Sequence, residues 1–189
     1  MKTPATVLLL AAVIFASACV PSLYPLYTEQ EVTFDSALIG VWTDAESGET
    51  WALSKRDKLD YRLVHTDTDG LRGEFIGRLV KVEDNLFFDI VPIKPGFTQS
   101  DFYRTQYFST HTFVHFAIDG STAKLSYLEP KWLEDYLAEH PDAIRHERLG
   151  GDIMLTSSPK ETQKFLLAQL NTRGAFSRPG ELTLKRGAQ

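Results

Sequence analysis

The chain is poor in cysteine, with one in 189 residues, at position 19. A lone thiol cannot form an internal disulfide, so this chain folds without one. It also lacks an apolar run long enough to cross a bilayer, because a spanning helix needs about 18 to 25 such residues. The run that begins at Thr6 is interrupted at Ser17 and stops at Pro21. Internal repeats and low-complexity tracts are missing as well, which favours an ordinary globular domain.

Basic residues are also fewer than acidic residues. The 20 Lys and Arg residues face 25 Asp and Glu residues, which gives a formal net charge of −5. An acidic chain is poorly suited to nucleic acid or to electrostatic binding of anionic lipid. The sequence contains no G-x-S-x-G, H-E-x-x-H or P-loop motif, the usual marks of several enzyme classes. We therefore expect no nucleic-acid partner, no cofactor and no catalytic residue that the sequence can nominate.

The first residues have the layout of a secretory signal. Lys2 supplies a positive charge, residues 6–15 are almost wholly apolar, and residues 16–18 are small and directly precede Cys19. This three-part pattern is typical of a leader that is removed after export. We predict a signal peptide over residues 1–18, cleaved before Cys19.

The four residues at the cut, Ala16-Ser17-Ala18-Cys19, resemble the lipobox of bacterial lipoproteins. In that family the cysteine thiol is joined to diacylglycerol and becomes the new N-terminus, and the chain departs from the family's preferred Leu by having Ala16. The resemblance implies lipidation of Cys19 and a membrane anchor without a spanning helix. Since Val20 is not acidic, it also implies an outer membrane location facing the periplasm. The alternative is ordinary cleavage that leaves a soluble protein with a free Cys19.

Residues 19–28, CVPSLYPLYT, look like the N-terminal sequence of a set of uncharacterised bacterial envelope lipoproteins. Residues 19–33 are predicted to form a lipid-anchored tether. Pro21 and Pro25 fix φ and favour an extended chain, which spans at most about 45 Å. The tether contains leucines and tyrosines, so we expect part of it to lie against the folded domain. Residues 34–189 are predicted to form a single domain.

From residue 34 onward, short aromatic and β-branched runs alternate with turn residues such as Asp69-Gly70 and Asp119-Gly120, a strand and hairpin pattern. Short connections indicate an antiparallel meander, because parallel strands need long crossovers. A meander of this length most simply curls into a small barrel or half-barrel, which removes exposed edges. The predicted strands are residues 38–44, 49–53, 60–66, 73–82, 86–91, 102–118, 122–128, 143–149, 152–156 and 181–186.

Two short helices are predicted in the C-terminal half. Residues 130–140 begin with a proline, which suits the first turn of a helix, and are followed by Pro141. Ser158 and Glu161 have the spacing of a capping box, with Pro159 between them. That box begins a helix which runs to about residue 171 and ends before Gly174.

Gly40-Val41-Trp42 resembles the G-x-W signature of lipocalins, which are ligand-carrying barrels. In that family the tryptophan packs near a basic residue of a late strand, a part that Lys185 or Arg186 could take. The family's Asn two residues before the glycine is replaced by Leu38. The resemblance implies a lipocalin-like barrel; the alternative is that Trp42 is a core aromatic that needs no ligand.

The predicted strand over residues 102–118 has two unequal faces. Even-numbered residues near its end are apolar, whereas the opposite face carries Tyr103, Tyr107, His111, Phe113 and His115. With Trp42, these residues are the candidate ligand or partner surface, unless the face lies under a helix. His111 and His115 would stand about 13 Å apart on a strand, too far to share an ion bound at about 2 Å. No metal site is therefore expected.

The sequence thus predicts a membrane-anchored envelope lipoprotein that acts as a binding or accessory module. It would hold a small apolar ligand or dock to an envelope assembly partner. The alternative is a hydrolytic envelope enzyme, which requires a histidine and a carboxylate within hydrogen-bond reach in a cleft.

Overall fold

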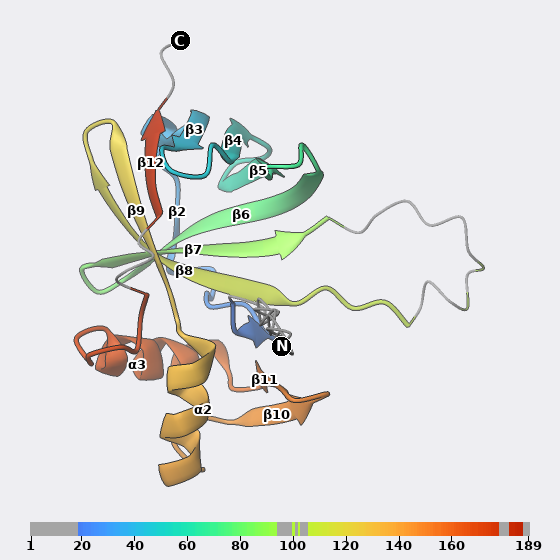
Figure 1. Ribbon diagram of the computed structural model, residues 1–189, viewed down its shortest axis with the longest axis vertical. Coiled ribbons are helices and arrows are strands. Elements are labelled where there is room, and N and C mark those ends of the chain that lie inside the picture. The colour runs from blue at the N-terminus through green and yellow to red at the C-terminus, as the bar shows by residue number, and fades with distance from the viewer. Residues whose placement is uncertain (1–18, 94–99, 101, 103–105, 178–181, 187–189) are drawn as a thin grey trace, which may run out of the picture.

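The computed structural model describes residues 19–93, 100, 102, 106–177 and 182–186 (Figure 1). The prediction of a mainly β fold, with an antiparallel meander and two helices in the C-terminal half, is confirmed. The elements are β1 (Pro21–Ser22), β2 (Val32–Thr33), the 3-10 helix η1 (Ser36–Leu38), β3 (Gly40–Asp44), β4 (Thr50–Lys55), β5 (Asp60–Thr66), β6 (Arg72–Val82), β7 (Asn85–Pro92), β8 (His111–Asp119), β9 (Thr122–Tyr127), α2 (Pro130–Glu139), β10 (His146–Leu149), β11 (Asp152–Leu155), α3 (Pro159–Gln169) and β12 (Leu182–Arg186).

Strands β3 to β9 and β12 form the unit called the barrel below. From β3 to β9 each strand pairs antiparallel with the next one along the chain. Strand β12 pairs with β9 and with β3, so the pairings run in a circuit and every barrel strand has two partners. Such a circuit was expected from the short loops between neighbouring strands, because it leaves no strand edge of the barrel unpaired.

The barrel interior is filled by apolar side chains. Trp42 is 1% exposed and its indole Nε1 donates to the Leu38 carbonyl at 2.9 Å. In β6, a Cβ on Gly77 would come within 2.5 Å of the Phe88 ring, which accounts for a glycine inside a strand. The buried members of this core are Leu38, Trp42, Tyr61, Leu63, Leu79, Phe88, Ile90, Val114, Phe116, Ala123 and Leu125.

One edge of β8 has two successive partners. Residues Val114 to Asp119 pair with β9, whereas His111 and Thr112 pair with β1. Strand β1 also pairs with β11 in parallel, and β11 pairs with β10. We call this point of divergence the fork: one branch continues the barrel, and the other begins a small sheet of β1, β11 and β10.

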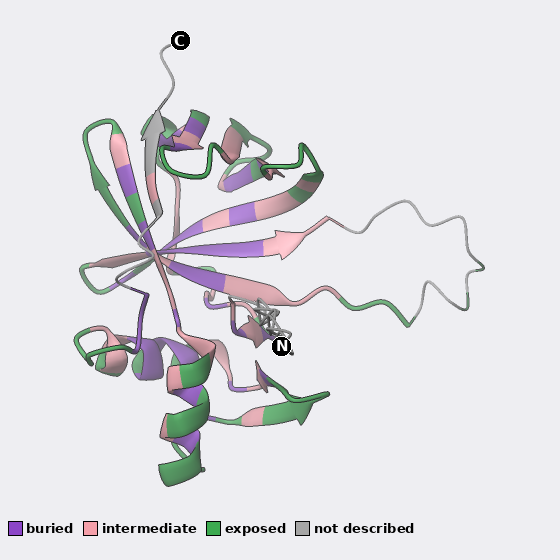
Figure 2. Cartoon of the chain, in the orientation of Figure 1, coloured by how far each residue is buried: buried purple, intermediate pink, exposed green. Residues whose placement is uncertain are grey.

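A second core lies between the outer wall of the barrel and a layer that contains α2, α3 and β11. Both helices carry buried as well as exposed residues (Figure 2), and Leu133, Leu137, Phe165 and Leu166 of these helices belong to this core. Part of the outer face of β6, β7 and β8, at Val80, Val82, Phe87 and Phe113, is therefore covered. The buried members of this core are Val20, Leu26, Val80, Val82, Phe87, Phe113, Leu128, Leu133, Leu137, Ile144, Ile153, Leu155, Phe165, Leu166, Ala175 and Phe176.

Local signals placed both helices correctly. The Ser158 side chain accepts from the Glu161 amide and the Glu161 carboxylate accepts from the Ser158 amide, so the capping box is present. Pro130 stands in the first turn of α2. The strand predicted from residue 102 begins instead at His111, and the one predicted from residue 143 begins at His146. Within the described residues, no helix is both long and apolar enough to span a membrane.

The N-terminal segment, residues 20–33, is packed into the domain instead of extending away from it. Val20, Ser22 and Leu26 are 7%, 0% and 0% exposed. Strand β2, at the far end of the segment, pairs with β6 on the barrel wall. Only Leu23 and Tyr24, at 39% and 47%, are exposed apolar side chains in this stretch.

Leu26 and Leu23 offer a matched test of this packing. Leu26→Ala removes a fully buried side chain and should lower the free energy of unfolding by about 2–5 kcal/mol. Leu23→Ala, on the exposed part of the segment, should change it by about 0.5 kcal/mol or less. Urea unfolding followed by tryptophan fluorescence measures both. Equal, small effects would show that the segment does not contribute to the core.

Candidate functional site

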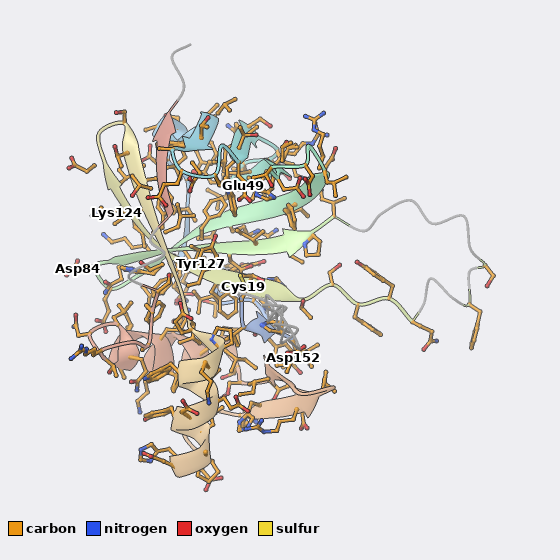
Figure 3. All side chains as sticks on the ribbon, in the orientation of Figure 1. Cys19, Glu49, Asp84, Lys124, Tyr127 and Asp152 are labelled. Atoms are coloured by element: carbon orange, nitrogen blue, oxygen red, sulfur yellow. The ribbon has the colours of Figure 1, made fainter. Side chains whose placement is uncertain are left out.

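Cys19 lies at the fork, directly before the N-terminal segment. It is half-buried and lines a cavity of about 10 Å³, and Figure 3 shows it beside Tyr127. About 10–15 Å³ is the least space that holds one water molecule, so a group attached to the sulfur has to leave the protein. The other residues that line the cavity are Val20, Phe87, Phe113, Tyr127, Leu128, Leu155, Leu166 and Phe176.

The surroundings keep the Cys19 thiol neutral. Burial, and secondly the negative charge of Glu129, raise its pKa to about 11. Burial likewise raises the pKa of the neighbouring Tyr127 hydroxyl. Since the thiolate is the nucleophile and the metal ligand, Cys19 in the folded domain is suited to neither role. Among the described residues, no group of three His, Cys, Asp or Glu side chains is placed to hold a metal ion.

Asp89 fixes the N-terminal segment to the barrel wall. Its carboxylate, 2% exposed on β7, accepts from the Leu26 amide at 2.8 Å. The Leu26 carbonyl in turn accepts from Gln163 Nε2 of α3 at 2.7 Å. Both polar groups of this buried peptide residue are therefore satisfied, one by the barrel and the other by the helical layer. We call this arrangement the Asp89 latch.

His111 completes the latch. Its Nδ1 lies 2.6 Å from Asp89 Oδ1, and its side chain is 14% exposed. Ser22 stands directly opposite His111 in the β1–β8 pairing, but its Oγ donates to the Tyr24 carbonyl at 2.7 Å. The fold thus gathers a serine, a histidine and an aspartate, yet both carboxylate oxygens are occupied and Ser22 is fully buried. This geometry fits a structural role.

Two further contacts extend the attachment of the segment. The Arg78 guanidinium lies 4.8 Å from the centre of the Tyr27 ring, and it is held by two hydrogen bonds to Asp60 of 2.7 and 3.0 Å. Glu31 forms an ion pair with Lys160 of α3. Burial alone would raise the pKa of Glu31, but hydrogen bonds from Lys160 and Thr28 outweigh it and lower the pKa to about 2.

Five of the six residues predicted as a ligand or partner surface are described, and the structure places them in different surroundings. Trp42 lies inside the barrel, whereas Phe113, 8% exposed, belongs to the second core outside it. His115 is half-buried between the rings of Phe87 and Phe176, at centroid distances of 5.3 and 6.2 Å. His111 is part of the Asp89 latch. Tyr107 is 39% exposed, and Tyr103 lies outside the described residues.

Of the two basic residues named with Trp42, the backbone register selects one. Arg186 of β12 stands directly opposite Trp42 of β3, and Lys185 stands opposite Thr43. The backbone of β12 therefore runs beside Trp42.

The described residues of the barrel interior line a small cavity. The cavity beside Trp42, Trp51 and Phe88 measures about 20 Å³, whereas pockets for small molecules usually measure about 300–1,000 Å³. An open groove of about 570 Å³ lies instead beside α3. Charged side chains dominate its lining, which consists of Glu31, Lys81, Val82, Glu83, Lys160, Gln163, Lys164, Leu167 and Ala168.

Sequence reasoning missed Asp89. The only signal was one carboxylate inside the apolar run of β7, LFFDIV, where a lone charge requires a buried partner.

No protein-family model matches the chain, and no curated protein or solved structure matches it either. The function is therefore inferred from the geometry of Cys19, the latch and the two cores.

Removing the latch should loosen the segment. Asp89→Ala leaves the buried Leu26 amide without an acceptor and should cost about 1–3 kcal/mol. Hydrogen exchange at Leu26 should rise before global unfolding does. Asp84→Ala, in the exposed turn after β6 (Figure 3), is the matched control and should change stability by about 0.5 kcal/mol or less. Unchanged exchange at Leu26 in Asp89→Ala would contradict the latch.

The Cys19 thiol should be slow to react in folded, unlipidated protein. Its alkylation by iodoacetamide should reach half its maximal rate near pH 11 in the folded state, and near the ordinary thiol value of 9.0 in urea. The rate is measured as the pH is raised, with tryptophan fluorescence reporting folding at each step. Identical midpoints in the two states would show that burial does not protect the sulfur.

Proposed function

We propose that the protein is an envelope lipoprotein, anchored through lipid on Cys19, whose barrel serves as an accessory module that docks to an envelope partner. The anchor would hold it at the outer membrane, facing the periplasm. Neither nucleic acid nor a cofactor has a part in this function. Val20, which is not acidic, is the residue that favours the outer membrane in lipoproteins of this type.

The observation that carries the proposal is the position of Cys19 relative to the fold. Val20, the next residue, is already buried in the second core. Cleavage before Cys19 would therefore keep the whole N-terminal segment and its contacts. The cavity at the sulfur is too small for an acyl chain, so the lipid would be free to enter a bilayer. Because each buried methylene contributes about 0.8 kcal/mol, more than one chain anchors a protein durably.

The filled barrel favours docking over carriage of a small apolar ligand. A carrier needs an interior space lined by apolar groups, and the cavity beside Trp42 measures about 20 Å³. The groove beside α3 is open, and its lining includes three lysines and two glutamates. Such a lining suits a polar or charged surface of a partner protein.

The hydrolytic alternative has less support. Its candidate pair would be Asp89 and His111, which are within hydrogen-bond reach. Asp89 is 2% exposed and also binds the Leu26 amide, so a substrate would have to displace the N-terminal segment. The pair is better suited to hold the fold than to activate water.

Mass spectrometry of the native chain and of Cys19→Ser tests the anchor. In the native chain, the membrane fraction should yield an acylated peptide that begins at Cys19. In Cys19→Ser the acylated peptide should disappear, because a serine hydroxyl cannot form the thioether. Val20→Ala, next in the chain, is the control and should remain acylated. A native peptide with an unmodified thiol would refute the proposal.

A further inference from the structure

The N-terminal segment has almost no slack. Strand β1 is paired on both sides, with β8 in the barrel and with β11 in the small sheet. The Leu23 amide adds a hydrogen bond of 2.8 Å to the Leu155 carbonyl. Between Cys19 and the first buried residue, Val20, there is no free residue at all. A lipid on Cys19 would therefore be attached to the body of the domain.

We propose that Cys19 is a rigid mount, so that the lipid bilayer lies against the fork and the domain is held there in one orientation. This inference rests on the proposed lipid anchor and deepens it by naming the membrane-facing surface. That surface is the opening of the fork, between the end of β9 and β1, where Cys19 stands beside Tyr127 (Figure 3).

Contacts along the whole N-terminal segment hold Cys19 in place against the domain. The first attachment is the pairing of β1 with β8 and β11, and the second is the Asp89 latch at Leu26. Beyond it, Tyr27 stacks on Arg78, and the Lys81 amide donates to the Glu31 carbonyl at 2.8 Å. Slack could appear only if these contacts were released in order from Cys19 onward. The anchor point cannot move away from the barrel wall until β1 is released, and the latch at Leu26 limits the slack after that.

The difference from a tether is large. Undocked, a segment of this length spans at most about 45 Å, and the domain would sample a wide range of heights and tilts. When the segment is docked as in the structure, the lipid on Cys19 would keep the domain in contact with the bilayer. Any envelope partner would then have to meet the domain at the membrane surface.

Energy transfer from the domain to the bilayer tests the mount. Acylation consumes the Cys19 thiol, so Asp84→Cys supplies the single free thiol for a donor dye on an exposed turn. Acceptor dyes on lipid headgroups of vesicles report the distance distribution by time-resolved fluorescence. The acylated native chain should give one narrow distribution.

The decisive variant carries a twelve-residue Gly/Ser linker between Cys19 and Val20. Such a linker has a root-mean-square length of about 17–21 Å and should broaden the distribution by a comparable amount. The same linker inserted in the exposed turn between Asp69 and Gly70 is the control and should leave it narrow.

Two results would overturn the mount. One is a native distribution as broad as that of the linker variant; the other is a linker variant as narrow as the native chain. Failure of the lipid anchor itself looks different: the chain without Asp84→Cys would then not remain with the vesicles and, once unfolded in urea, would bind thiol dye at Cys19.

Discussion

The carboxylate of Asp89 is the constraint on which the arrangement of the two layers depends. A carboxylate placed in an apolar wall is costly unless it is hydrogen-bonded. Asp89 Oδ1 lies 2.6 Å from His111 Nδ1 on the neighbouring strand, and Asp89 accepts from the Leu26 amide, 63 residues away in the chain. Because the Leu26 carbonyl then accepts from Gln163 of α3, one buried carboxyl group links the barrel, the N-terminal segment and the helical layer.

The N-terminal segment is the element that makes the second core possible. The outer faces of β6, β7 and β8 carry apolar residues such as Val80, Phe87 and Phe113, which would be exposed if the barrel stood alone. Val20 and Leu26 fill the space between this wall and the helices. Strand β1 also joins the β10–β11 hairpin to the edge of β8. The helical layer is thus attached by backbone pairing as well as by apolar contact.

What the sequence could predict was local. The turns at Asp69-Gly70 and Asp119-Gly120 and the capping box at Ser158 depend on residues a few positions apart, and all three have the predicted form. The Asp89 latch could not be predicted from the sequence because its partners are distant in the chain. Strand β1 was also missed, since it has two residues and begins with Pro21. A short strand of this kind is held by its neighbours and not by its own propensity.

The positions of the described candidate surface residues likewise depend on contacts that are distant in the chain. Alternation correctly put His111, Phe113 and His115 on one face of β8, but only tertiary packing decides what covers that face. The second core covers Val80, Phe87 and Phe113 on the outer wall of the barrel, whereas other outer positions carry exposed polar side chains. An example is the exposed ion pair between Arg62 and Glu74, at 2.8 Å. Such pairs contribute about 0–1 kcal/mol to stability. Under the proposed function, the charged groove beside α3 and the anchor at Cys19 are the places where this protein would meet its partner and the membrane.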